Sequence, residues 1–454
     1  MKKLLLILLC LPMIGFGQQT YVPDDNFEQM LINQGYDAPP LDNYVYTSMI
    51  NSVTSLNLNN NGVADFTGIQ DFISLTYLEA DGNNPATVLD LSNHPTLTYL
   101  RMDGSQVENI NLSGCTALED LAVGQNVNLT NLDLSGCTSL ERLALVSSSL
   151  TSLDLSGLIS LEELNIQNSD ITNLNLNNCQ NLHTILAANH NLSSLDLSTN
   201  ISLAYFDITY SRGTLTDLDL SNCPDLWMLL AQSGQNTLPL TRLSSLNVSG
   251  TSLREIHVAY NNLISLDLSG QTKLELIDAK GQGPHGNPLI DNGLETVYLD
   301  DVGTAPISFG QGIDIFLDNN NLQYVDLSCV GDIDRLDLDY NPLTSLNLQN
   351  GLNQNINRIE TSYTTGPLQC VQVDDEAWSF VNWGNSSQHQ FPSSTNFSDN
   401  CGYVNCTPTS IQEYSSNKEL LKVTDLLGRE TKQTNQPLFY IYDDGTVEKR
   451  IVIE

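Results

Sequence analysis

An L-x-L-like triplet recurs along the middle of the chain with an alternating step. It begins at Leu132, Leu143, Leu153, Leu164, Leu174, Ile185 and Leu195, so a longer step of 11 alternates with a shorter step of 10. Two interleaved frames therefore each repeat every ~21 residues, a period typical of repeat proteins. Such a period predicts a stack of coils, because one coil cannot bury its own apolar edge and stacking makes the core continuous.

The repeat predicts a leucine-rich repeat solenoid that is mainly β, with short parallel strands on stacked coils. The alternating units at residues 161–171 and 172–179 resemble the nested 21-residue class of bacterial leucine-rich repeats. This resemblance covers about two thirds of the chain and implies extended segments on both sides of each coil. Leu164 should therefore point into the core and Asn165 toward solvent.

The residues before the repeats predict an export signal. Lys2 and Lys3 precede an apolar run, and the small residues Gly15 and Gly17 follow it, which is typical of a secretory signal peptide. The run is too short for a confident membrane span, and no later segment is long and apolar enough. An alternative is a lipoprotein signal that uses Cys10.

Residues 26–34 place Phe27, Met30 and Leu31 at helical spacing. We therefore expect a helical N-terminal cap that covers the first coil, which would otherwise expose its apolar end. The expected organisation along the chain is a signal peptide at 1–17, an N-terminal cap at 18–52, the solenoid at 53–369, a C-terminal cap at 370–406, a linker at 407–418 and a small C-terminal β tail at 419–454.

The cysteines fall into two groups. Four occupy the same slot, three residues after a triplet, and predict a ladder of small buried thiols: Cys115, Cys137, Cys179 and Cys223. Beyond the repeats, in a compartment that permits disulfides, we expect a bond between Cys370 and Cys401 that tethers the C-terminal cap. Cys406 is the rival partner, and the pairing of Cys329 and Cys406 stays open.

The last 36 residues resemble the C-terminal sorting domain by which Bacteroidetes proteins leave the cell through the type IX secretion system. The resemblance lies in residues 422–430 and 438–446 and in the basic pair Lys449 and Arg450 before the last apolar strand. The residues that we assign to the sorting tail on this basis are Gly428, Arg429, Gly445, Lys449 and Arg450. It implies that the secretion machinery recognises this tail, and that release or attachment to the cell surface follows removal of the tail.

The two repeat frames differ in the residue between the leucines. The frame of Leu132 and Leu153 nearly always has Asp or Asn there, which a bond from a short polar side chain to nearby backbone explains. The other frame is variable, as a solvent-facing recognition row should be. From this row and its exposed neighbours we expect these binding residues: Tyr77, Tyr99, Arg101, Arg142, Tyr205, Tyr210, Arg254, His257, Tyr260 and Tyr298. The alternative is that they only cover strand backbone.

Charge and motifs exclude several function classes. The formal charge of −36 opposes binding to nucleic acid. The histidines form no H-E-x-x-H motif and there is no G-x-S-x-G elbow, so we expect no catalytic residue, no cofactor and no metal site. The alternative to the absence of a metal site is a calcium site made by an acidic run at Asp332, Asp334, Asp337 and Asp339.

We therefore expect an exported binding protein, secreted or attached to the cell surface, that recognises an extracellular protein or glycan through the variable strand face. The alternative is a structural or adhesive component of the cell surface without a single defined ligand.

Overall fold

The structure is a computed structural model that describes residues 17–83, 88–234, 242–282, 293–305, 312–364, 366–384 and 386–403, together with the backbone of three strands between 420 and 451. The chain divides into two compact units, 1–406 and 407–454, which are described separately. The signal peptide up to residue 16, Cys406, the linker, Gly428, Arg429 and Gly445 lie outside the described residues.

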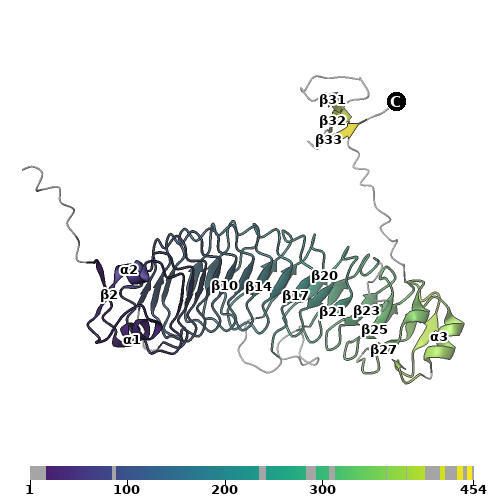
Figure 1. Ribbon diagram of the computed structural model, residues 1–454. Helices are drawn as coiled ribbons and strands as arrows, with labels where there is room; N and C mark the ends of the chain where they lie inside the picture. Colours follow the sequence, from purple (N-terminus) through teal and green to yellow (C-terminus); the bar gives the residue numbers. More distant parts are fainter. Residues whose placement is uncertain are drawn as a thin grey trace, which may run out of the picture. The chain divides into compact units, whose positions relative to one another are not determined.

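The first unit is a leucine-rich repeat solenoid (Figure 1). One side of its coils forms a parallel sheet, which we call the large sheet and which has 15 strands in the described part of the chain. Its strands are β3 (Ser55–Asn57), β4 (Tyr77–Glu79), β6 (Tyr99–Arg101), β8 (Asp120–Ala122), β10 (Arg142–Ala144), β12 (Glu163–Asn165), β14 (Thr184–Leu186), β15 (Tyr205–Asp207), β17 (Met228–Leu230), β19 (Glu255–His257), β21 (Leu276–Asp278), β23 (Ile313–Phe316), β25 (Ile333–Asp337), β27 (Arg358–Glu360) and β29 (His389–Gln390).

The other frame forms a second, interrupted set of parallel strands, which we call the second ladder. Within the described residues it is divided into separate short sheets. These are β5 (Val88–Asp90), β7 (Asn109–Asn111) and β9 (Asn131–Asp133); β11 (Ser152–Asp154) and β13 (Asn173–Asn175); β16 (Asp217–Asp219) and β18 (Ser245–Asn247); β20 (Ser265–Asp267) and β22 (Thr296–Tyr298); and β24 (Tyr324–Asp326), β26 (Ser345–Asn347), β28 (Cys370–Gln372) and β30 (Asn396–Ser398).

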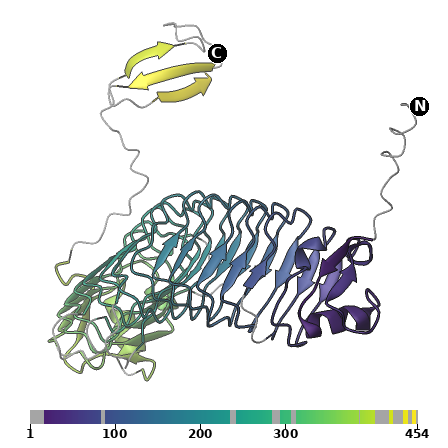
Figure 2. The same cartoon turned by 90° about the vertical axis from the view of Figure 1, so that its left-hand side faces the viewer.

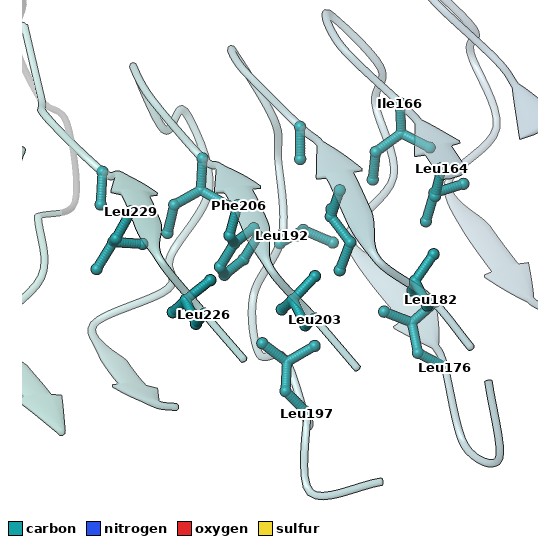
Figure 3. Close-up of a cluster of buried hydrophobic side chains, with 14 of the residues drawn as sticks. Leu164, Ile166, Leu176, Leu182, Leu192, Leu197, Leu203, Phe206, Leu226 and Leu229 are labelled. Carbon is teal, nitrogen blue, oxygen red and sulfur yellow. The ribbon is translucent and has the colours of Figure 1, made fainter. Parts of the chain in front are cut away.

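The core lies between the large sheet and the second ladder. The middle residue of each large-sheet triplet is buried, and its two neighbours face outward, because successive side chains of a strand point to opposite sides. Figure 3 shows Leu164, Phe206 and Leu229 of the large sheet packed with Leu176 and Leu197 from the other side of the coils. The alternating step of the triplets therefore arises because each coil supplies two rows of apolar side chains to one core.

The N-terminal cap covers the first coil. It contains β1 (Gln19–Tyr21) paired antiparallel with β2 (Tyr44–Tyr46), and the helices α1 (Asp25–Gln34) and α2 (Thr47–Ile50). The Asp24 carboxylate accepts N–H bonds from Asn26 and Phe27 at the start of α1, and from Ala64 and Asp65 of the first coil. One side chain thus joins the helix to the solenoid, and the cap lies at one end of the stack in both views (Figure 2).

The uniform Asp/Asn frame has the structural role expected of it. The Asp133 carboxylate accepts the backbone N–H of Ser135 at 2.9 Å, and Asp154 accepts that of Ser156 at 2.9 Å. These bonds lower the pKa of both carboxyl groups, because they favour the charged form. Where a strand of the second ladder carries Asp or Asn at this position, the polar residue therefore fixes the turn that follows it.

The cysteines of the repeats are buried free thiols. Cys115, Cys137 and Cys179 donate their S–H groups to carbonyl oxygens of the preceding coil, at 3.1 to 3.2 Å. Burial raises the pKa of Cys137 to about 12 and that of Cys179 to about 11. The thiols therefore act as compact core residues with a weak hydrogen bond along the stack.

Parallel pairing continues past residue 369, into the segment expected to be a separate cap. β28 pairs in register with β26, and β30 pairs with β28, while α3 (Glu376–Trp383) packs beside β30. Val371 and Phe397 fill the buried middle positions. The structure contains a disulfide between Cys370 and Cys401, and Cys329 is also disulfide-bonded.

The second unit contains a three-stranded antiparallel sheet. Its strands are β31 (Leu420–Thr424), β32 (Pro437–Tyr442) and β33 (Val447–Ile451), with β32 in the centre. All three lie within the small β tail expected at 419–454. Lys449 and Arg450 lie on β33, where the backbone alone is described.

Candidate functional site

The outward-facing side chains of the large sheet form the candidate binding surface. The parallel register places equivalent residues of successive coils side by side, so the first and third residues of each triplet form two continuous rows. We call these the outward rows. Of the residues expected to bind, Tyr77, Tyr99, Arg101, Arg142, Tyr205 and His257 lie in them.

The N-terminal part of the rows carries a tyrosine pair. The rings of Tyr77 and Tyr99 stack with their centroids 4.4 Å apart and their planes 7° from parallel. The Tyr77 hydroxyl donates to Glu79, and this bond, with burial, raises the pKa of the phenol above its usual value. Asn57 and Asn59 also donate to the Glu79 carboxylate, at 2.7 and 3.0 Å. The two tyrosines thus form a rigid, uncharged, stacked aromatic pair on the surface.

Three arginines expected to bind, two in the outward rows and one just before β19, are paired with acids. Arg101 Nε lies 2.9 Å from Asp81, and Arg142 Nε lies 2.9 Å from Asp120 on the adjacent strand. Arg254, which precedes β19, lies 3.9 Å from Glu275. Because each guanidinium is about half exposed, these ion pairs add little stability but hold the arginines in place.

The centre of the large sheet carries an aromatic and aliphatic group that we call the central patch, made of Tyr205, Trp227, Met228 and Leu230. The Tyr205 and Trp227 rings meet edge to face with centroids 6.2 Å apart. Tyr205 pairs directly with Met228 in the parallel register, and Leu230 follows two residues later on the same strand. Trp227 is 38% exposed, which is a large apolar area for a surface position.

The sequence pattern did not single out Trp227, Met228 or Leu230. Trp227 precedes its triplet and so falls outside the two rows that the period defines. The available signal was the run Leu226–Leu230, where consecutive apolar residues replace the usual alternation of apolar and polar. In an exposed row such a run indicates a contact surface.

The C-terminal part of the large sheet is acidic. Phe316 lies between Lys280, at 5.8 Å from the ring centroid, and Arg335, at 5.4 Å. Beside it, burial and the charge of Asp318 raise the pKa of Asp337 to about 7. Two acids of the alternative calcium site, Asp337 and Asp339, thus repel other carboxylates here. Within the described residues, no group of three or more His, Cys, Asp and Glu side chains could hold a metal ion.

The assignment of Tyr298 to the outward rows was wrong. Tyr298 pairs with Asp267 of β20 and belongs to the second ladder. The spacing from Ile277 to Val297 is close to one full repeat, but an intervening insertion supplies much of that length. The next strand of the large sheet is therefore β23, and Tyr298 lies on the other side of the coil.

Tyr210 and Tyr260 occupy turns after the large sheet. Both have a left-handed backbone, with φ of 57° and 61°. The Tyr210 hydroxyl accepts a bond from Gln232 at 3.4 Å, and the Tyr260 ring lies against Gly281 of the next coil, where a Cβ atom would approach the ring to 2.8 Å. These tyrosines border the outward rows.

No protein-family model and no curated protein matches this chain. The functional domain of InlJ from Listeria monocytogenes, described as including a cysteine ladder, is similar with 19% identity over 95% of this chain and 97% of that chain, at a TM-score of 0.35. The internalin InlF from the same organism is 17% identical over 85% and 97%, at 0.34, and the APL1 leucine-rich repeat domain is 18% identical over 78% and 86%, at 0.43.

At this level of identity the likeness concerns the fold alone, and the strand register establishes that fold independently. No helix in the described part of the chain combines the length and hydrophobicity needed to cross a membrane.

Proposed function

We propose that this chain is an exported binding protein that recognises a protein partner through the central patch of the large sheet. The observation that carries the proposal is the edge-to-face pair of the exposed Trp227 and the half-buried Tyr205, beside Met228 and Leu230. Large aromatic side chains held rigidly on strands are the residues that most often dominate binding energy. The aliphatic neighbours favour an apolar protein surface over a glycan.

The charges around the central patch favour a basic partner. Asp207 and Glu255 lie in the outward rows on the strands that flank or form the patch, and Glu275 follows one coil later. Arg254, whose backbone N–H donates to the carbonyl of Trp227, has its guanidinium paired with Glu275. An apolar centre with an acidic border is complementary to a partner whose apolar contact is surrounded by Lys or Arg.

The test is partner capture with the intact exported protein and with variants of the patch. Immobilised wild type should retain a discrete protein from the surroundings of the producing cell, identified by mass spectrometry. Tyr205→Ala and Trp227→Ala should each weaken binding of that protein by about tenfold or more in a titration. A Tyr363→Ala variant is the matched control, because Tyr363 is an exposed tyrosine outside the patch.

Loss of binding in the patch variants with unchanged thermal melts supports recognition. If all variants bind equally, the large sheet is not the recognition surface, and a structural or adhesive role without one ligand becomes the better account.

We further propose that the signal at 1–17 and the tail at 419–454 direct export through a Bacteroidetes type IX secretion system, followed by release or surface attachment. The support is the resemblance of the tail sequence to sorting domains of that system. Deletion of residues 419–454 should leave the protein inside the cell envelope, whereas the intact chain should reach the medium or the cell surface. Equal export of both forms would contradict the proposal.

A further inference from the structure

The second ladder opens between β22 and β24. Sheet hydrogen bonding ends at β22 and resumes at β24, although the two strands follow each other in the stack. The opening forms a half-open groove of about 530 Å³, whose walls include Thr296, Tyr298, Asp300, Gln323, Tyr324 and Asp326. This volume suits one or two sugar rings or a ligand of similar size.

Two tyrosines on adjacent coils line this groove. Tyr298 is 52% exposed and Tyr324 is 44% exposed. Tyr298 is the third residue of β22 and Tyr324 the first of β24, so the two side chains occupy diagonal outward positions across the opening. An exposed aromatic face is a platform for the C–H face of a pyranose ring.

Tyr403, which lies two residues from the disulfide at the end of the solenoid, packs against Tyr324. The Tyr403 ring lies 5.8 Å from that of Tyr324, and its hydroxyl donates to the carbonyl of Cys370 at 3.3 Å. The bond between Cys370 and Cys401 anchors this segment two residues away. The aromatic wall is therefore fixed before any ligand arrives, which lowers the entropic cost of binding.

The polar walls present oriented acceptors. Asp326 accepts bonds from the Tyr324 hydroxyl at 2.9 Å and from the backbone N–H and hydroxyl of Ser328 at 3.0 and 2.7 Å. Burial and the neighbouring Asp326, Asp301 and Asp267 raise the pKa of Asp300. Hydroxyl groups can donate to such carboxylates, and the amide of Gln323 can both donate and accept. An anionic ligand would be repelled.

A second groove of the same size provides an internal comparison. It lies between β9 and β11, which do not pair with each other in the second ladder, and it also measures about 530 Å³. Its walls carry Thr130, Asn131, Asp133, Ser152, Asp154 and Ser156, and its lining holds no aromatic side chain. The two grooves thus share their origin, volume and acidic residues but differ in the tyrosine platforms.

We propose that the groove between β22 and β24 is a saccharide-binding site for a neutral glycan, with sugar rings on Tyr298 and Tyr324 and hydroxyl groups bonded to Asp300 and Asp326. The site lies on the other side of the coils from the central patch, so it is independent of the protein partner proposed above. Because Asp326 is already bonded by three donors, its role is that of an oriented acceptor and not of a free counter-ion.

The test uses the full exported chain in affinity electrophoresis, through native gels that contain a neutral β-glucan, a mannan or a xylan, and on an array of neutral oligosaccharides. At least one neutral glycan should retard or retain the wild type. Tyr298→Ala and Tyr324→Ala should each weaken that binding by about tenfold or more, whereas Tyr298→Phe should keep most of it, because the ring remains. Asn131→Ala, in the groove without tyrosines, is the control and should bind as the wild type does.

Two outcomes would overturn the proposal: no binding to any neutral glycan, or binding that both tyrosine variants retain. If an alanine variant has an altered thermal melt, Asp300→Asn is tested in its place. Asp300→Asn should weaken glycan binding while both tyrosine rings remain, and Tyr298→Phe should still bind. Loss of the protein partner in the Trp227→Ala variant leaves this test unaffected.

Discussion

Leu143 of β10 lies directly opposite Leu164 of β12, and both side chains are buried in the core. The same register places Arg142 beside Glu163 on the solvent side. Adjacent residues of one short strand therefore face opposite sides, one buried in the core and the next exposed to solvent, as strand geometry requires.

This register predicts a sharp difference between neighbouring substitutions. Leu164→Ala removes a fully buried side chain and should lower the free energy of unfolding by roughly 2–5 kcal/mol. Glu163→Ala, at the adjacent exposed position, should change it by about 0.5 kcal/mol or less. Urea melts of both variants, followed at several wavelengths to detect partly unfolded coils, measure the two values. Similar losses in both variants would mean that the register is wrong.

The sequence predicted the solenoid because each coil repeats the same physical demand. Every coil contributes apolar residues to two rows that fill one core, so leucines such as Leu132 and Leu143 recur at fixed steps. The four cysteines occupy one repeat position for the same reason. The capping helix was predicted with bounds one residue from those of α1, because its apolar residues are spaced for burial on the first coil.

The functional surface was less predictable, since its residues obey no period. The insertion before Tyr298 shifted the count by half a repeat and moved that residue to the wrong side of the coil. Trp227 was missed because it precedes the strand triplet. The continuation of the stack beyond residue 369 was hidden because Val371 and Phe397, not leucines, fill the middle positions. Side-chain neighbours across the opening at β22 and β24 depend on strand pairing, which spacing alone does not reveal.

The disulfide should stabilise the C-terminal end locally. The bond between Cys370 and Cys401 closes a loop with a sequence separation of 31 residues, so replacing both by serine should remove roughly 3–4 kcal/mol from that end. Hydrogen exchange measures this effect strand by strand. Amides of β28 and β30 should exchange faster in the double variant, while β8 and β10 keep their wild-type protection. Equally faster exchange throughout the solenoid would contradict a local role.

The thiols of the cysteine ladder should be unreactive in the folded protein. Burial raises the pKa of Cys179 and of Cys223 to about 11, so few thiolates form at pH 8 and the buried sulfur is also inaccessible. We expect labelling by a disulfide reagent to be at least about 100-fold slower in the native state than after unfolding. A Ser156→Cys variant, with its thiol at an exposed turn, is the positive control. Rapid labelling of the wild-type repeats would show that the ladder is not closed.

Asp337 should make the C-terminal coils less stable as the pH rises. Its pKa is raised to about 7, so the folded protein keeps a proton that the unfolded chain loses near pH 4. The stabilisation from this proton is complete below pH 4 and is lost as the pH rises to about 7. Asp318, Asp339 and Glu360 contribute the repulsion. In melts between pH 4 and 8, Asp337→Asn should gain stability over the wild type as the pH rises, and parallel profiles would refute this.

His190 should produce the opposite dependence in the middle of the solenoid. It is fully buried in the slot that Asn126 and Ser169 occupy in other coils, and its Nδ1 accepts the N–H of Leu192 at 3.0 Å. Burial, with the charge of Arg212, lowers its pKa to about 4. Below pH 6.5 the unfolded chain therefore binds a proton that the folded protein refuses, so stability falls as the pH decreases from 6.5 to about 4.

Replacing His190 by asparagine should remove this acid sensitivity. Asn126 shows that an amide in the same slot donates to two backbone carbonyls, at 2.7 and 2.9 Å, and accepts a backbone N–H from Ser105 of the preceding coil, so His190→Asn should fold without a buried titratable group. Thermal or urea melts at pH 7.5 and pH 4.5 measure the change. The stability lost between these values should be smaller in the variant by on the order of 2–3 kcal/mol. If wild type and variant lose the same amount, protonation of His190 does not govern the acid response, and the carboxylates of the outward rows must account for it.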